Sequence, residues 1–177
     1  MFGFFERMVD PFPDTPVAAP PTRSLGAFVW HFAKPFWPQL LVLAITTAIF
    51  SFIEVSLFSF LGDIVDWFAS SDPESFLADR TWDLVALGIL ILIVMPAIQL
   101  FDGLINFQSV FGNLPMRFRY QMHRWLLGHS VAFFQDEFAG RVSQKLMQTA
   151  LAVREVIVKS IDVFLYVAVY FTGILLV

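Results

Sequence analysis

Cysteine is absent from this sequence and charged residues are few. Without cysteine, disulfide bonds, thiolate metal sites and palmitoyl anchors are all excluded. Charged residues make up 15% of the 177 residues and hydrophobic residues 58%, whereas soluble domains are usually about 25% charged. The net charge of −4 provides no basic stripe of the kind that nucleic-acid binding requires. The composition therefore predicts a membrane protein without a nucleic-acid partner.

A phosphate-binding loop of the form GxxxxGK[ST] is also absent,. The lysines are Lys34, Lys145 and Lys159, and none of them follows a glycine. We therefore expect that this chain is not itself an enzyme, does not hydrolyse ATP and carries no cofactor. The spacing of His123 and His129 does not place them on one helical face, so no metal site is expected.

Long apolar runs dominate what is present. A bilayer core of about 30 Å is crossed by about 20 helical residues, so residues 39–61, which contain the single charge Glu54, predict one crossing. Residues 84–101 carry no charge and predict a second helix, bent at Pro96 because proline removes a backbone hydrogen bond,. Residues 163–177 are too short to cross unless the helix also uses residues before Asp162.

The N-terminal segment is rich in proline. Residues 11–21 read "PFPDTPVAAPP", and this density of proline disfavours helix and favours an extended, solvated chain. We expect residues 1–24 to form a Pro-rich cytoplasmic tail.

Charge distribution predicts the orientation. Of the 11 lysine and arginine residues, Arg80 alone lies between the first two apolar runs, in an otherwise acidic segment. The others lie before the first run or within residues 112–160. Because basic loops remain on the cytoplasmic side, the pattern predicts an integral membrane protein with a cytoplasmic N-terminus, a short acidic outer loop and a long inner excursion.

The excursion has the pattern of two helices. Phe118, Met122, Trp125 and Leu126 recur at helical spacing before it turns, and Val142 and Leu146 resume the pattern afterwards,. Helices of about 20 residues would extend about 30 Å from the bilayer. Later in the second helix, Glu155 and Lys159 form a favourable i,i+4 pair,.

The turn between the two helices lies in "VAFFQDEFAGRVSQKL", residues 131–146. Phe133 and Phe134 are expected to cap the packing of the helices on each other. Asp136 and Glu137 suit the start of a short transverse helix, where the helix dipole favours acids. Gly140 is expected to supply a tight turn before the returning helix.

The stretch "LLGHSVAFFQDEFAGRVSQKLMQTALAVREVI" resembles the first intracellular loop of ABC exporters, ATP-driven transporters with six-helix transmembrane domains. In that family a phenylalanine pair, polar residues and a Gly-Arg step lead into the third transmembrane helix, as Phe133, Phe134, Gly140 and Arg141 do here. The resemblance covers residues 25–177. Thr149 departs from it, because many members carry an acidic residue at this position.

The resemblance implies an all-α membrane protein with long transmembrane helices and cytoplasmic extensions. Its segments would be a first transmembrane helix at about 38–67, a second at about 83–112 extended to about 132, a coupling segment at about 133–140 and a third helix from about 141, truncated at 177. The coupling segment would seat on a nucleotide-binding domain. The residues implied in this coupling are Phe133, Phe134, Gln135, Asp136, Glu137, Phe138, Gly140 and Arg141.

In this interpretation the chain is the N-terminal part of a longer exporter of the bacterial inner (cell) membrane. ATP and Mg²⁺ would bind a nucleotide-binding domain outside the chain, and a second transmembrane domain would complete a homodimer or heterodimer. The function implied is ATP-driven export of an unidentified substrate. The alternative is a small non-catalytic membrane scaffold whose helical stalk binds another cytoplasmic protein.

Two acids lie within the apolar runs or next to them. A charge in lipid is costly and usually faces a bundle interior or an aqueous cavity. Glu54 could therefore line a translocation path and contact a cationic substrate, or pair with polar groups of a neighbouring helix. For Asp102 we favour a structural pairing.

Overall fold

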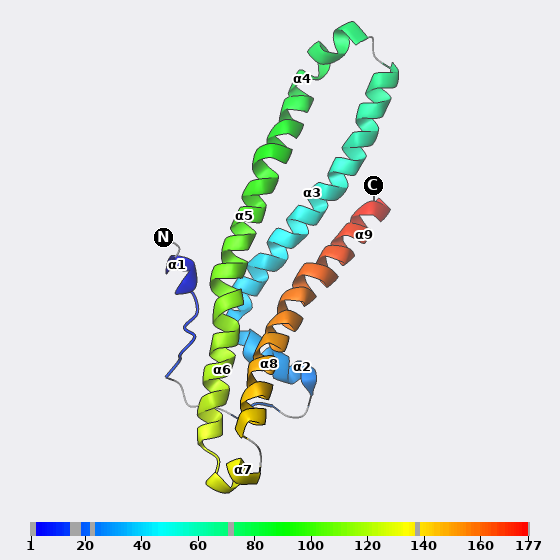
Figure 1. Cartoon of the computed structure of the whole chain (residues 1–177). Coiled ribbons are helices and arrows are strands. Elements are labelled where there is room, and N and C mark those ends of the chain that lie inside the picture. Colours follow the sequence, from blue (N-terminus) through cyan, green and yellow to red (C-terminus); the bar gives the residue numbers. More distant parts are fainter. Residues whose placement is uncertain (1–2, 15–18, 22–23, 71–72, 137–138, 177) are drawn as a thin grey trace. The chain divides into compact units, whose positions relative to one another are not determined.

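The computed structural model describes residues 3–14, 19–21, 24–70, 73–136 and 139–176, with the side chains of residues 68–70, 73–79, 135, 136 and 139 left aside. None of these described residues lies in a β-strand, and nearly all of them are helical (Figure 1). The all-helical prediction is therefore confirmed for this part of the chain. The chain folds as two compact units, residues 1–43 with 103–161 and residues 44–102 with 162–177.

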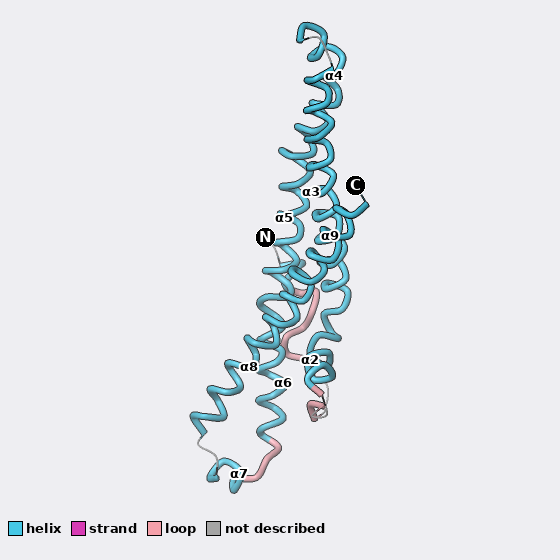
Figure 2. Tube along the Cα trace, turned by 90° about the vertical axis from the view of Figure 1, so that its right-hand side faces the viewer, coloured by secondary structure: helices cyan, strands magenta, loops and turns pink. Residues whose placement is uncertain are grey.

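The first unit contains the N-terminal segment, an elbow formed by residues 25–36, and a helical hairpin formed by residues 112–136 and 139–159. The hairpin helices pack along each other, and a short loop and a short helix join their ends (Figure 2). The elements are α1 (Gly3–Glu6), α2 (Leu25–Ala33), the 3₁₀ turn η1 (Lys34–Phe36), residues 37–43 of α3 (Trp37–Ser70), residues 103–105 of α5 (Met95–Ile105), the π-helix η3 (Asn106–Phe111), α6 (Gly112–Leu127), α7 (Val131–Asp136), α8 (Ala139–Lys159) and residues 160–161 of η4 (Ser160–Leu165).

An aromatic core holds the elbow to the hairpin. Phe118 of α6 is 1% exposed, and its ring centroid lies 4.4 Å from that of Phe32 in α2. Phe28, one turn earlier in α2, meets Phe118 edge to face at 6.1 Å. Ser24 begins α2 as its N-cap, because its Oγ accepts a hydrogen bond from the Ala27 N–H at 3.1 Å,. The cap and the core together fix where the elbow starts and which face it buries.

The N-terminal segment is not fully solvated, in contrast to the sequence prediction. Val9 is 7% exposed. The Asn113 amide of α6 donates to the Glu6 carbonyl oxygen at 2.8 Å and to the Val9 carbonyl oxygen at 3.3 Å. Further along α6, Arg117 donates to the Asp10 carbonyl oxygen at 2.7 Å.

The last contacts of this segment lie nearer the end of α6. Arg124 donates to the Pro13 carbonyl oxygen at 3.1 Å, and the rings of Phe12 and Tyr120 meet edge to face at 5.2 Å. Residues 3–13, which we call the strap, therefore run alongside α6.

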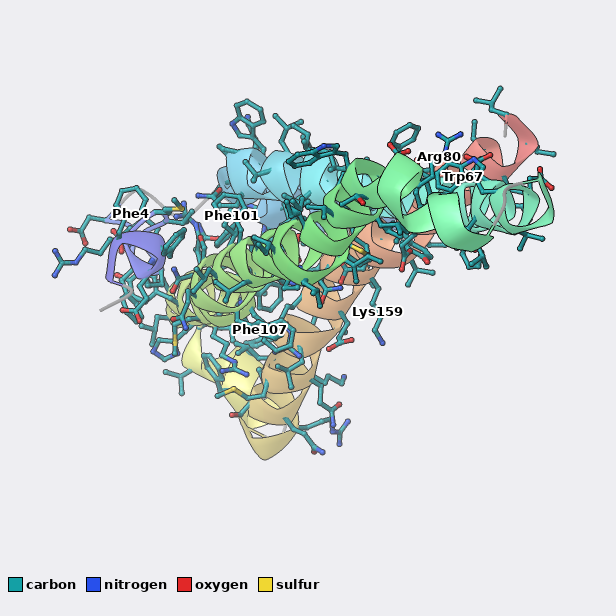
Figure 3. All side chains as sticks on the ribbon, turned by 90° about the horizontal axis from the view of Figure 1, so that it is seen from above. Phe4, Trp67, Arg80, Phe101, Phe107 and Lys159 are labelled. Atoms are coloured by element: carbon teal, nitrogen blue, oxygen red, sulfur yellow. The ribbon has the colours of Figure 1, made fainter. Side chains whose placement is uncertain are left out.

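The second unit consists mainly of apolar helices. It contains residues 44–70 of α3, α4 (Pro73–Ile89), the π-helix η2 (Leu90–Val94), most of α5 (Met95–Ile105), residues 162–165 of the π-helix η4 (Ser160–Leu165) and α9 (Tyr166–Leu176). Near the junction of α3 and α4, the Arg80 guanidinium lies 4.5 Å from the centroid of the Trp67 ring and pairs with Asp83 at 3.3 Å (Figure 3).

Polar side chains inside the second unit are paired across helices. The Thr46 hydroxyl of α3 donates to the Asp102 carboxylate of α5 at 2.6 Å. The Tyr166 hydroxyl of α9 donates to the Glu54 carboxylate of α3 at 2.7 Å. In apolar surroundings such hydrogen bonds offset part of the cost of removing a carboxylate from water. The expected structural pairing of Asp102 is therefore observed.

The two prolines of the second long helix each follow a π-helical turn. The Met95 N–H bonds to the Leu90 carbonyl, five residues back, and Pro96 follows with no N–H to donate,. Residues 106–111 form the second such turn, four residues before Pro115. The disturbance predicted at Pro96 thus takes the form of a widened turn in the preceding residues.

Three helical stretches within the described residues are long and apolar enough to cross a membrane. They are Leu25–Trp67, Arg80–Leu127 and Gly140–Leu176, with mean hydropathies of 2.2, 2.7 and 1.6 over their most apolar windows. The third stretch includes Asp162 and the residues before it, so this helix is not confined to the apolar run 163–177.

Gly173 provides a test of packing in the second unit. A Cβ atom added there would lie 3.1 Å and 3.2 Å from the two methyl carbons of Val55. We expect Gly173→Leu to lower the free energy of unfolding by about 1–3 kcal/mol, because overpacking displaces neighbouring groups. Gly62→Leu is the matched control, since a Cβ at Gly62 meets nothing within 4 Å. Equal thermal stability of the two variants in detergent would contradict this packing.

The strap is tested by proteolysis. Asn113→Leu removes the hydrogen bonds to the Glu6 and Val9 carbonyls. Each bond contributes about 0.5–1.5 kcal/mol, so we expect tryptic cleavage after Arg7 to become about tenfold faster, because such cleavage follows the population of the open segment. Gln121→Leu, which also replaces an amide side chain of α6 by leucine, should leave the rate unchanged. A rate that is equal in both variants would show that the strap is held by other contacts.

Candidate functional site

The candidate site is the apex of the hairpin formed by α6, α7 and α8 (Figure 1). At the end of α6, the Gly128 N–H bonds to the Trp125 carbonyl at 3.1 Å and the His129 N–H bonds to the Leu126 carbonyl at 2.9 Å. After a short loop, the Phe133 N–H bonds to the Ser130 carbonyl at 3.1 Å, within the first turn of α7. Residues 128–130 thus form a short connection between the end of α6 and the start of α7.

The glycines of the apex differ from the sequence prediction. Gly140 was expected to form a tight turn, but it is the second residue of α8, and none of the described glycines has a positive φ. A Cβ at Gly140 would meet nothing within 4 Å, whereas one at Gly128 would lie 3.3 Å from the Trp125 carbonyl oxygen. The expectation for Gly140 is therefore wrong, and the glycine in a restricted position is Gly128.

A chain of aromatic rings leads from α6 into α7. The ring centroids of Trp125 and His129 are 4.3 Å apart, those of His129 and Phe133 are 4.9 Å apart, and those of Phe133 and Phe134 are 5.3 Å apart. The His129 Nδ1 also lies 3.1 Å from the Trp125 carbonyl oxygen. Such contacts stabilise more than burial alone, so α7 packs on the end of α6 through a continuous row of rings.

Phe133 and Phe134 are half-buried and line two cavities between the hairpin helices. Phe133 lines a cavity of about 370 Å³ together with Phe118 and Leu146. Phe134 lines one of about 630 Å³ together with Tyr120 and Met147. The two rings thus border the space between α6 and α8.

The exposed apolar residues at the apex are ones that the sequence analysis did not single out. Leu127, the last residue of α6, is 69% exposed, and Val131, the first residue of α7, is 73% exposed. Helical periodicity could have assigned Leu127 to the outer face. Nothing in the pattern separates Val131 from Phe133 and Phe134, because a short helix offers too few turns to define a face.

The remaining predicted coupling residues have varied positions. Gln135 and Asp136 are the last two residues of α7. The expectation that Asp136 begins a transverse helix is therefore wrong, because that helix starts at Val131. Glu137 and Phe138 lie outside the described residues, and Arg141 lies exposed in the first turn of α8.

Charged side chains are clustered in the C-terminal half of α8, the half farther from the apex. The Glu155 carboxylate pairs with Lys159 at 3.1 Å, which confirms the predicted i,i+4 pair, and with Arg154 at 2.8 Å. The Arg154 guanidinium also lies 3.7 Å from the centroid of the Phe111 ring. Arg154 is the least exposed member of the group and Lys159 the most exposed. The ring and the carboxylate therefore restrict Arg154 more than the single ion pair restricts Lys159.

The second candidate position is Glu54 in α3. Its carboxylate accepts a hydrogen bond from Tyr166 at 2.7 Å, and the Tyr166 ring is stacked on Tyr170 with centroids 5.6 Å apart. Glu54 is half-buried. The arrangement joins one carboxylate to two aromatic rings, a combination able to attract a cation. Within the described part of the chain, no group of three or more His, Asp or Glu side chains could hold a metal ion.

Comparison with known proteins gives one informative similarity. Over its full length the chain is 37% identical, across 179 aligned residues, to a curated protein of Haemophilus influenzae named "Uncharacterized ABC transporter ATP-binding protein". The chain spans 29% of that protein's length. No family model matches the chain, and no solved structure matches it. The chain is therefore similar to one part of a protein that is named as an ABC transporter ATP-binding protein.

Proposed function

We propose that this chain forms the first part of the transmembrane domain of an ABC exporter. In the complete protein, three further helices would finish a six-helix domain and a nucleotide-binding domain would bind ATP and Mg²⁺. Two such transmembrane domains would assemble around the path of an unidentified substrate. The support is the similarity over the whole chain to a protein named as an ABC transporter ATP-binding protein, together with three helices long enough to span a membrane.

The observation that carries the proposal is the continuity of two candidate spans with the hairpin. The stretches Arg80–Leu127 and Gly140–Leu176 run without a break in helical structure from apolar segments to the apex. A helix transmits displacement along its axis better than a loop does, because its backbone hydrogen bonds resist bending. The hairpin is therefore suited to carry motion between a cytoplasmic motor and the spans.

The apex residues divide into two groups in this proposal. Val131 and Leu127, which are exposed and apolar, would insert into a groove of the nucleotide-binding domain and be desolvated there. Phe133 and Phe134 would act from inside, because they fix α7 against α6 and α8. Buried apolar anchors at the centre of an interface usually dominate its binding energy.

The proposed orientation places the apex and the N-terminus in the cytoplasm and the junction of α3 and α4 outside. The basic residues support it, because they gather near the N-terminus and along the hairpin,. The membrane would be the inner (cell) membrane of a bacterium, which is consistent with the source of the similar protein.

The coupling role of the apex is tested in the full-length protein reconstituted in vesicles. We expect Val131→Asp to lower the vanadate-sensitive ATPase activity that accompanies transport by about tenfold, because it buries an unpaired charge in place of an apolar anchor. Folding should be retained, since an acid in the first turn of α7 is compatible with the helix dipole. ATP-dependent accumulation of a fluorescent amphiphile in inverted vesicles provides the second measurement.

Leu151→Asp is the matched control for this experiment. Leu151 is 40% exposed on α8 and lies about 18 Å along the helix from its start at Ala139,, away from the proposed contact. A cysteine at position 131 should also form a cross-link to the nucleotide-binding domain, in a segment that has no cysteine of its own. Normal ATPase activity and transport in Val131→Asp, with no cross-link, would reject docking at the apex.

Glu54 is proposed to line the substrate path and to favour cations. We expect Glu54→Gln to reduce export of cationic dyes several-fold and to leave export of neutral dyes unchanged, because a neutral amide no longer attracts positive charge. Tyr166→Phe is the control, since it removes the hydrogen bond but keeps the carboxylate. If the ratio of cationic to neutral export is the same in Glu54→Gln and in the unmodified protein, Glu54 has only a structural role.

A further inference from the structure

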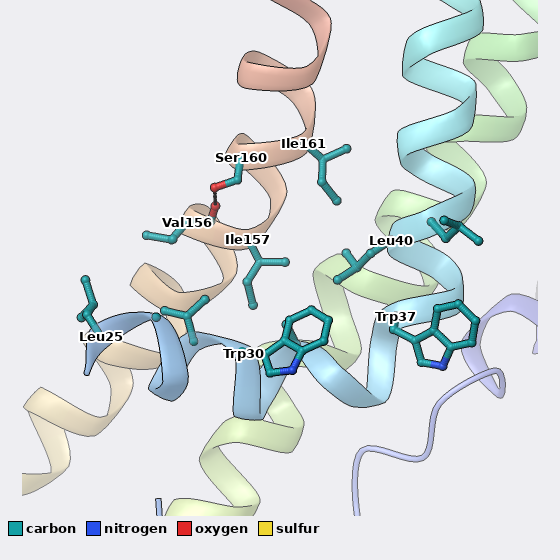
Figure 4. Close-up of a pocket in the computed structure, with 12 residues that line it drawn as sticks. Leu25, Trp30, Trp37, Leu40, Val156, Ile157, Ser160 and Ile161 are labelled. Atoms are coloured by element: carbon teal, nitrogen blue, oxygen red, sulfur yellow. Dashed lines mark hydrogen bonds between the residues drawn. The ribbon is translucent and has the colours of Figure 1, made fainter. Parts of the chain in front are cut away.

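A third cavity, apolar in its lining, lies at the elbow, away from the apex. Its volume is about 540 Å³, and its walls come from α2, the first turns of α3, the end of α8 and the first residues of η4 (Figure 4). This volume is within the range of about 300–1,000 Å³ that is usual for small-molecule sites. All of its walls belong to the first unit.

The interior of this cavity has almost no polar character. Apart from the indole N–H groups at its rim, Ser160 has the one polar side chain among the described residues that line it. Its hydroxyl donates to the Val156 carbonyl at 2.6 Å, within its own helix. The interior, which includes Leu40, Ile157 and Ile161, therefore suits a hydrocarbon chain better than a polar ligand.

The rim of the cavity has the opposite character. Trp30 and Trp37 line it and are 59% and 56% exposed. In Figure 4 the nitrogen atoms of both indoles lie on the side away from Leu40 and Ile161. Lys34, exposed on η1, lies in the chain between the two tryptophans. Two indole N–H donors thus border the apolar interior, and the exposed Lys34 lies one helical turn along the chain from each tryptophan, outside the cavity lining.

We propose that this cavity binds an anionic phospholipid. One acyl chain occupies the space lined by Leu40, Ile157 and Ile161, and the phosphate lies near Lys34 and the indole N–H groups of Trp30 and Trp37. Tryptophan is enriched where a span meets the membrane surface, and a lysine near that surface attracts anionic lipid. The elbow begins the candidate span Leu25–Trp67, which puts the rim at the level of lipid headgroups.

A phospholipid fits the cavity better than a further apolar helix does. A helix would cover Leu40 and Ile157 but would offer no anion to Lys34 and no acceptor to the two indoles. In a phospholipid the acyl chain matches the apolar interior and the phosphate matches the polar rim. The proposal is independent of ATP hydrolysis and of docking at the apex.

Brominated lipids test the site, because bromine quenches only those tryptophans that it contacts. The full-length protein would retain Trp30 and Trp37, with its other tryptophans changed to phenylalanine, in phosphatidylcholine vesicles containing increasing amounts of dibrominated phosphatidylglycerol. We expect quenching at low mole fraction, with an apparent affinity about fivefold higher than for dibrominated phosphatidylcholine. A protein that retains only Trp82, which is 83% exposed, should show no preference.

Two variants separate the parts of the site. Gly26→Phe fills the cavity from a position where a Cβ meets nothing within 4 Å, and it should abolish the preference for phosphatidylglycerol. Lys34→Gln should lower the preference about fivefold and leave the cavity intact. Gly62→Phe, which also enters open space, should behave like the unmodified protein.

The outcomes that overturn the proposal are distinct. Equal quenching by the two brominated lipids would indicate ordinary membrane lipid at the elbow. No quenching by either lipid would indicate that another part of the longer protein covers the cavity. A preference that survives both Gly26→Phe and Lys34→Gln would place anionic lipid elsewhere.

Discussion

The contact between Phe118 of α6 and Phe32 of α2 is the interaction on which the first unit depends. It joins the elbow to the hairpin, and the strap then runs along the same α6. Burial of a large apolar side chain contributes about 1.5–3 kcal/mol, more than an exposed ion pair usually does. The cavity at the elbow and the apex of the hairpin are therefore built on one shared support, although they lie at different parts of it.

Much of this fold could be predicted from the sequence, because apolar runs and helical spacing respond directly to the bilayer and to helix geometry. The run 84–101 and the spacing of Phe118 and Met122 already indicated long helices that continue as a hairpin. The pairing of Glu155 with Lys159 follows from helix geometry alone,. The widened turn before Pro96 was predicted only as a bend, because the sequence does not show whether a missing N–H is accommodated by a kink or by a π-helical turn.

The apex was harder to predict for a physical reason. The pattern "VAFFQDEF" places several large apolar residues next to each other, and adjacent residues on a short helix point in different directions. Which of them faces inward depends on the space between α6 and α8, and this is a tertiary property. The sequence therefore predicted Phe133 and Phe134 as coupling residues and did not identify the exposed Val131. The strap was missed for a similar reason, since bonds from side chains to distant carbonyls leave no periodic signal.

The hydrogen bonds that hold the strap to α6 are made to its main chain, beside the side-chain contacts of Val9 and Phe12. Asn113, Arg117 and Arg124 bind carbonyl oxygens, including that of Pro13, and proline lacks an N–H but keeps its carbonyl. A segment too rich in proline for helix or sheet is therefore well suited to this form of attachment. During evolution, the side chains of the strap that face solvent should vary freely, while the three donors on α6 should be retained. Substitutions in the strap therefore need not be accompanied by substitutions in α6.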